Sequence, residues 1–157
     1  TVGGSIYSRF GFSDVLTMFL ALNASVELYK GGVVPLTEYA QRPYDRDILV
    51  RVLVPKENAR FVYQSVRNSQ TDFPVLTCAA AKLADGSIRA AIGARPGKAV
   101  LYTAAPEAGE TAEKFAARFA AEVKADIKTE SNLRGGAEYR RHLAGVLTKR
   151  AVCRLEG

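Results

Sequence analysis

The sequence predicts an α+β fold, with one helix and short strands in its first part, then further strands followed by two longer helices. Strand-like alternation dominates the middle of the chain, whereas apolar residues recur every three or four positions in the last third. Runs of strands followed by runs of helices are typical of α+β domains. The 157 residues suffice for one ordinary domain or two small ones, and we expect the two parts to meet near residues 58–72.

The first predicted helix, "FSDVLTMFLALN", comes shortly after an N-terminal glycine pair. Ser13 is a natural N-cap, because its hydroxyl can accept a hydrogen bond from a backbone N–H of the first turn. Asp14 lies in that first turn, where a carboxylate favours the helix. The apolar stripe of this helix consists of Leu16, Phe19 and Leu20.

Strand patterns fill the middle of the chain, because apolar and polar residues alternate there between turn signals. We expect strands at residues 24–30, 47–55, 59–66 and 99–104, a short strand and short helix over 33–43, and a hairpin over 73–94. Glycines 31–32 turn the first strand, and Pro55 ends a later one. Asp85 and Gly86 predict a two-residue hairpin turn, since both tolerate positive φ.

Two helices are predicted after the strands. In the first, Thr111 can cap the N-terminus, and Phe115, Phe119 and Val123 fall four apart on one face. In the second, over 137–155, the expected buried stripe is Tyr139, Leu143, Val146, Leu147 and Ala151. The polar run Glu138–Arg141 is expected to be a solvated helix face.

Composition excludes several classes of protein. No apolar run reaches the ~20 residues of a membrane helix, and no signal peptide is visible, so we expect a cytoplasmic protein. The net charge of +6 is spread along the chain without a basic run, which argues against nucleic-acid binding. Cys78 and Cys153 are expected to be reduced, buried thiols, and a single histidine, His142, excludes a two-histidine zinc site.

Few residues indicate chemistry by themselves. Gly3 and Gly4 can let a backbone approach a phosphate, although a plain turn is the commoner meaning of such a pair. Asp14 can either stabilise its helix or accept hydrogen bonds from a ligand hydroxyl, and Asp72 is expected to cap the start of a strand. Side chains that could stack on a planar ring, or simply pack in a core, are Tyr7, Phe10, Phe12 and Tyr63. No nucleophile–base pair stands out.

Four short motifs occur in an order that resembles the flavin-binding medium subunit of molybdenum hydroxylases, the xanthine dehydrogenase and carbon monoxide dehydrogenase flavoprotein family. They are "TVGGSI" with a following "SD", "DILVRVLVP", "VYQSVRNSQTDFPVLTCAAAKL" and "RGGAEYRRHLAGVLTKRAV". The resemblance implies that residues 1–57 are the second lobe of a vanillyl-alcohol-oxidase-type (PCMH-type) FAD-binding domain. Residues 58–157 would be a CO dehydrogenase flavoprotein C-terminal domain, a three-stranded antiparallel sheet packed on helices. The N-terminal FAD lobe of the family would lie outside this chain.

The resemblance also implies which residues contact FAD. Thr1, Gly3 and Gly4 match a pyrophosphate loop, and Asp14 matches a cofactor-binding aspartate. Further matching positions are Ser5, often Asn in the family, Leu49 in the "DIL" strand, and Gln64, where many relatives have Lys. The stretch "YSRFGF" replaces a usually small, Pro-containing segment, so the loop over the cofactor is expected to differ.

The implied function is electron transfer, without a catalytic side chain in this chain. A molybdopterin-containing large subunit would oxidise the substrate, with a purine or other N-heterocycle as our expectation. Two [2Fe-2S] clusters on a small subunit would pass electrons to FAD, which would reduce an acceptor such as NAD. The alternative is a non-catalytic docking module of such a complex that does not itself bind FAD.

Overall fold

The computed structural model describes residues 1–56 and 60–156, so the expected boundary at residues 57–58 lies outside the described residues. Within them the helices are α1 (Val2–Tyr7), α2 (Asp14–Ala21), α3 (Leu36–Tyr39), α4 (Ala112–Asp126) and α5 (Ala137–Glu156). The strands are β1 (Ser25–Leu28), β2 (Gly32–Pro35), β3 (Leu49–Leu53), β4 (Arg60–Val66), β5 (Leu76–Lys82), β6 (Ile88–Gly93) and β7 (Val100–Ala104). The predicted α+β class is therefore confirmed.

The strands form two antiparallel sheets, a small one in the order β2-β1-β3 and a larger one in the order β4-β5-β6-β7. The larger sheet has one strand more than the three expected. Strand β4 is the addition, since it pairs with β5 along its whole length, from Arg60 opposite Lys82 to Val66 opposite Leu76. Val62 and Val66 then pack on the helical side, so a strand expected at the seam becomes an edge of this sheet.

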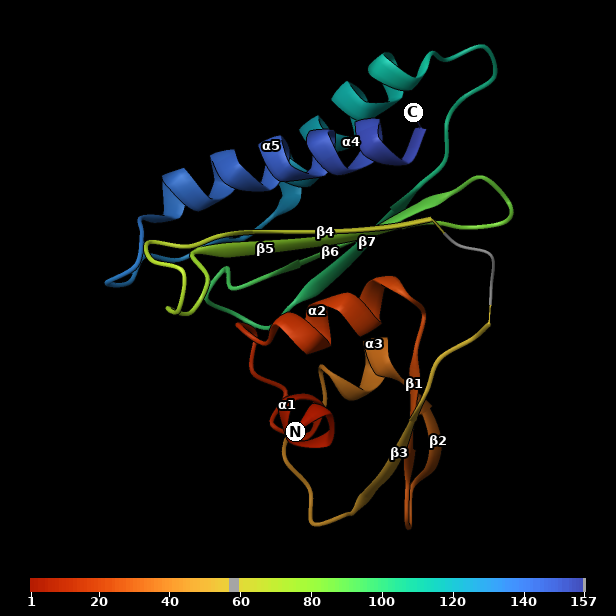
Figure 1. Ribbon diagram of the computed structural model, residues 1–157, viewed down its shortest axis with the longest axis vertical. Helices are drawn as coiled ribbons and strands as arrows, with labels where there is room; N and C mark the ends of the chain where they lie inside the picture. Colours follow the sequence, from red (N-terminus) through yellow and green to blue (C-terminus); the bar gives the residue numbers. More distant parts are fainter. Residues whose placement is uncertain (57–59, 157) are drawn as a thin grey trace.

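The larger sheet is covered on both faces. Helices α4 and α5 lie over one face, and α2 lies under the other, with α1, α3 and the small sheet beyond it (Figure 1). Residues 1–56 are called the small unit below, and residues 60–156 the large unit. The small unit therefore docks against the face of the sheet that the two late helices leave open.

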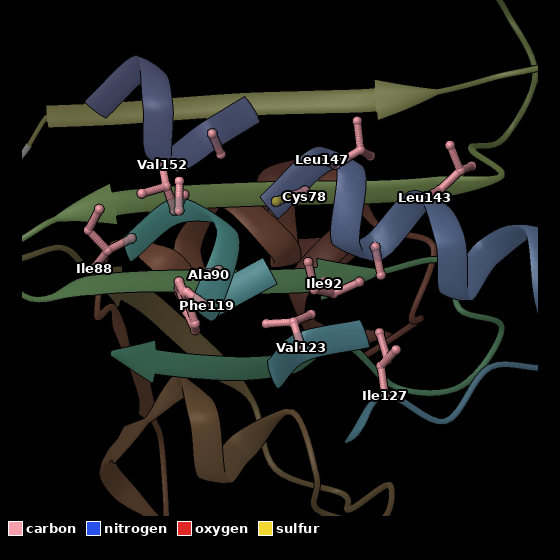
Figure 2. Packing of buried hydrophobic residues seen from close by; sticks show 14 of the residues in the cluster. Cys78, Ile88, Ala90, Ile92, Phe119, Val123, Ile127, Leu143, Leu147 and Val152 are labelled. Atoms are coloured by element: carbon pink, nitrogen blue, oxygen red, sulfur yellow. The ribbon is translucent and has the colours of Figure 1, made fainter. Parts of the chain in front are cut away.

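Alternation along β5 explains the alanine-rich sequence of this sheet. Cys78 and Ala80 belong to the core under α4 and α5, whereas Ala79 and Ala81 belong to the core shared with the small unit. Side chains of β6 and of both helices close the first core (Figure 2). Small side chains suit a strand buried on both faces, because helices approach it closely from either side.

Predicted caps and core residues are confirmed in most positions. The Ser13 hydroxyl accepts from Leu16 N, and the Thr111 hydroxyl accepts from Lys114 N. The expected core residues Phe115, Phe119, Leu143 and Leu147 are buried.

Helix α5 departs from its predicted pattern at one turn. Tyr139 is exposed and Arg140 is fully buried, which reverses the prediction for both. The Arg140 guanidinium donates to the carbonyl oxygens of Val75, Glu130 and Gly135 and to Asn132 Oδ1. Val75 lies 65 positions away, just before β5, whereas the other three acceptors lie in the loop before α5. The hydrogen bonds therefore satisfy the buried guanidinium and hold this loop against the segment that leads into β5.

Two smaller predictions are also wrong. The β5–β6 hairpin has a longer turn than two residues, because Gly86 N donates to Leu83 O and Leu83 N donates to Ser87 O. Gly86 supplies the positive φ, 84°, as expected for a turn followed by a bulge. Cys153 is exposed rather than buried, while Cys78 is buried, and both are free thiols.

Candidate functional site

The glycine pair lies in a helix rather than in a loop. Thr1 is the N-cap of α1, and its hydroxyl accepts from Gly4 N at 3.1 Å, which starts the helix at Val2. This cap overrides the poor helix propensity of Gly3 and Gly4. A Cβ atom placed on Gly3 would meet no other atom within 4 Å, so the outer face of this turn is open.

A shallow depression of about 450 Å³ joins the start of α1 to the start of β3. Its lining is Gly3, Gly4, Tyr7, Asp47, Ile48 and Leu49. The Asp47 carboxylate accepts from the backbone N–H groups of Lys30 and Gly31, at 3.0 and 2.8 Å. These hydrogen bonds lower the pKa of Asp47, and the one from Lys30 N has the largest effect. They also fix the segment that leads into β3. The structure thus places Gly3, Gly4 and Leu49 in the lining of one depression.

A buried arginine holds α1 in place. Arg9, at φ 50°, lies with its guanidinium 4.0 Å from the centre of the Tyr39 ring. It donates to Pro43 O at 2.9 Å and forms an ion pair with Asp45 at 3.1 Å. Because these contacts tie the end of α1 to the segment before β3, they set the position of the glycine pair relative to Leu49.

Ser5 and Asp14 line a second depression of about 230 Å³ on the neighbouring side of α1. The Asp14 carboxylate already has two partners from the large unit. The Tyr63 hydroxyl donates to Oδ1 at 2.5 Å, and Arg67 donates to Oδ2 at 2.6 Å. Burial and then the bond to Asp14 raise the pKa of Tyr63, so its hydroxyl stays protonated. Asp14 is therefore both a surface carboxylate and a link between the two units.

The link continues as a row of charged groups. Arg67 also donates to Asp72 O at 2.6 Å, and the Asp72 carboxylate accepts from Arg134 at 2.8 and 3.0 Å. The bond to Arg134, followed by that to Phe73 N, holds the pKa of Asp72 below its usual value. Asp72 therefore does more than cap a strand, since it joins the loop before β5 to the loop before α5.

The structure does not bring Gln64 to either depression. Its amide donates to Leu147 O at 3.3 Å, so the side chain faces α5. Tyr63 is the neighbouring residue on β4 and faces the small unit, where it reaches Asp14. Thr1, in turn, is an exposed helix cap and does not line either depression.

Sequence reasoning did not identify Arg67 and Arg134 as partners of the site. One signal was present for Arg67, since it follows Tyr63 by four positions and an extended chain returns to the same face at even spacing. Nothing in the sequence places Arg134 beside Asp72, because the two are separated by 62 positions.

The described parts of the chain, residues 1–56 and 60–156, contain no group of three or more His, Cys, Asp or Glu side chains placed to hold a metal ion. None of their helices combines the length and apolar character needed to cross a membrane.

A sheet covered by two helices on one face and by the small unit on the other defines a two-unit α+β protein with its candidate site on the small unit. The family model for the CO dehydrogenase flavoprotein C-terminal domain matches residues 61–155. The chain therefore belongs to the CO dehydrogenase flavoprotein C-terminal domain family. A comparison with curated protein sequences gave no match.

Several solved structures share the fold of nearly the whole chain. CO dehydrogenase from Hydrogenophaga pseudoflava matches with a TM-score of 0.81 at 23% identity, and reconstituted CO dehydrogenase from Oligotropha carboxidovorans with 0.81 at 22%. Quinoline 2-oxidoreductase from Pseudomonas putida 86 matches with 0.79 at 20%. Each match covers 99% of this chain and 60% of the other, so the small unit belongs to the shared fold and these relatives have further sequence.

Proposed function

We propose that this chain is part of the FAD-binding subunit of a molybdenum-containing hydroxylase. The observation that carries the proposal is the first depression, where Gly3, Gly4 and Leu49 meet although 45 positions separate Gly4 from Leu49 in the sequence. Family membership of the large unit supports it, since that family is defined on a flavoprotein.

The residues present fit a dinucleotide. The open space over Gly3 lets a ligand approach the backbone, and a side chain at that position would occupy it. Ile48 and Leu49 add an apolar wall, while Ser5 and Asp14 supply polar groups on the other side of α1.

Each residue would have a binding role. Thr1, Gly3 and Gly4 would hold the pyrophosphate, Leu49 would contact an apolar part of the cofactor, and Asp14 would accept from a cofactor hydroxyl while Tyr63 and Arg67 orient it. A bound flavin supplies the redox chemistry, and the protein supplies position and electrostatics. We assign no catalytic side chain to this chain.

The proposal extends to the complex. A large subunit with molybdopterin would oxidise the substrate, a small subunit with [2Fe-2S] clusters would deliver electrons to FAD, and an acceptor such as NAD would receive them in the cytoplasm. A purine or another N-heterocycle is the proposed substrate class, and the similarity to quinoline 2-oxidoreductase, named for an N-heterocycle, supports it.

The test is the flavin content of the full-length polypeptide that carries this chain. We expect a yellow protein that releases FAD, identified by chromatography after denaturation. Ile48→Glu should lower the FAD occupancy, because Ile48 lines the depression and is 64% exposed, which leaves folding unaffected. Val50→Glu is the matched control, at 50% exposed and outside the depression.

A colourless protein that takes up no added FAD would contradict the proposal and favour the non-catalytic docking module. Equal FAD loss in both variants would show that the depression is not where the cofactor binds.

A further inference from the structure

A third hollow, here called the aromatic pocket, adjoins the depression that contains Asp14. Its volume is about 400 Å³, within the range of small-molecule sites. Four loops form it, namely those between α1 and α2, before β5, between β6 and β7, and between α4 and α5. Its lining includes three aromatic side chains and two polar ones, namely Phe10, Phe12, Phe73, Asn132 and Arg134.

Three phenylalanines of this pocket are turned outward instead of into a core. Phe10, Phe12 and Phe73 are 48%, 39% and 53% exposed. Phe10 and Phe12 are stacked, with ring centres 5.0 Å apart and planes 14° from parallel, and Phe73 tilts against Phe12 at 4.6 Å. Exposure of three mutually packed rings is costly in water, and such surfaces mark binding sites.

The backbone beneath the rings is tightly constructed. Ala94 has φ 59°, a rare conformation for alanine, and its N–H donates to Gly11 O at 2.6 Å. A Cβ on Gly11 would lie 1.8 Å from Gly97 O, so only glycine fits there. These contacts anchor the loop that carries Phe10 and Phe12, so the pocket is a fixed feature of the fold.

The polar side chains of the pocket offer donors only. Asn132 Oδ1 already accepts from Arg134 N and from Arg140, which leaves the Asn132 amide nitrogen as a donor. The Arg134 guanidinium lies 5.2 Å from the Phe73 ring centre and uses Nε and Nη2 to bind Asp72. Among the described residues, neither Arg134 Nη1 nor Asn132 Nδ2 donates to a protein acceptor.

We infer that the aromatic pocket binds a planar aromatic compound that carries a negatively charged group. The rings stack on the Phe10, Phe12 and Phe73 side chains, and the anion accepts from Arg134 and Asn132. This site is separate from the surface proposed for the dinucleotide, although the two share a wall of phenylalanines.

The test uses two compounds of the same shape, 2-naphthoate and its neutral analogue 2-naphthamide, with the full-length polypeptide saturated with FAD. Calorimetric titration should show one saturable site that prefers 2-naphthoate. Phe12→Leu should weaken both compounds by roughly two- to tenfold, the usual worth of an aromatic pair. Arg134→Gln should weaken 2-naphthoate to the level of the amide and leave the amide unchanged.

Phe61→Leu is the matched control, since Phe61 is 37% exposed and lies outside the pocket, and it should not change either affinity. The inference is overturned if neither compound binds, if both bind equally well, or if Phe61→Leu acts like Phe12→Leu. Binding of 2-naphthoate to the FAD-free polypeptide that disappears on saturation with FAD would also overturn it, because the pocket would then belong to the flavin site.

Discussion

One carboxylate joins the two units of the molecule. Asp14 begins a helix of the small unit, and its two oxygens accept from Tyr63 and Arg67 of the large unit. Hydrogen bonds to a charged group stabilise more than neutral ones. The residue therefore serves folding as well as the proposed ligand contact.

The link predicts non-additive effects on stability. Tyr63→Phe removes one donor and should lower the free energy of unfolding by ~0.5–3 kcal/mol, as for loss of a hydrogen bond to a carboxylate. In an Asp14→Ala background the same change should cost much less, because its acceptor is gone. Urea unfolding of the four proteins in this double-mutant cycle measures the difference. Full additivity would mean that the bond contributes nothing in solution.

The two cysteines should differ in reactivity. Cys78 is enclosed in the sheet core, and burial raises the pKa of its thiol to about 12, so the reactive thiolate is absent at neutral pH. Cys153 is exposed on α5. A thiol reagent should modify one group in the native chain and two after unfolding, and Cys153→Ser should abolish the native reaction. Rapid modification of native Cys153→Ser would contradict the burial of Cys78.

Arg140 shows where prediction from the sequence fails at the residue scale. Helical periodicity separates apolar from polar positions, so an arginine among charged neighbours is predicted to face water. Its acceptors are the carbonyl oxygens of Glu130 and Gly135 in the loop before α5 and of Val75, 65 positions away, and helical periodicity carries no information on how this loop and β5 come together. The same limit applies to the pairing of Asp14 with Arg67.

At the scale of elements, α4 and α5 are held to the sheet by aromatic and aliphatic side chains. Phe115 and Phe119 stack one turn apart, with ring centres 6.0 Å apart, against the sheet core. Phe119→Ala should lower the free energy of unfolding by ~3–5 kcal/mol through lost burial and a cavity. Tyr139→Ala on α5 is the control, since Tyr139 is exposed and should cost far less. Equal losses in chemical denaturation would refute this core assignment.

An ion pair between Glu110 and Arg118 holds the loop before α4 against that helix, and it should make the stability of the protein depend on pH. Arg118 donates to both carboxylate oxygens of Glu110, and this interaction lowers the pKa of Glu110 from 4.5 to about 2. A lowered native pKa contributes stability that is complete above 4.5 and is lost as the pH falls toward 2.

Glu110→Gln should therefore be less stable than the unchanged chain at neutral pH. The difference in stability between the two proteins, called the gap here, should narrow as the pH falls from 4.5 toward 2. Thermal unfolding at low salt over a pH series measures the gap. A gap that stays constant with pH would show that the ionised pair contributes nothing to stability.

Elements were more predictable than their arrangement. Caps at Ser13 and Thr111 and the periodicity of the late helices were sufficient to locate α2, α4 and α5, because these signals are local. The docking of α2 on the sheet was not predictable, since it brings Thr17 to within 3.2 Å of Thr77 from 60 positions away. The glycine pair was predicted to be a loop. This prediction is wrong because the Thr1 hydroxyl accepts from Gly4 N and starts a helix there.

For the molecule as a whole, the sheet is a shared wall between two cores. Its helical side belongs to the large unit, and its other side anchors the small unit, in which α1 lies beyond α2 as seen from the sheet (Figure 1). This arrangement gives the candidate site a rigid base, which a binding surface needs.

The most direct test of the account is the effect of a single charge over the glycine turn. Gly3→Asp and Gly3→Asn add side chains of equal size where a Cβ meets nothing within 4 Å, so both should fold, and aspartate suits the first turn of a helix. We predict that Gly3→Asp weakens FAD binding by the full-length polypeptide by at least about tenfold relative to Gly3→Asn, through repulsion of the pyrophosphate. Equal FAD dissociation constants for the two variants, with unchanged melting temperatures, would contradict a pyrophosphate site at this turn.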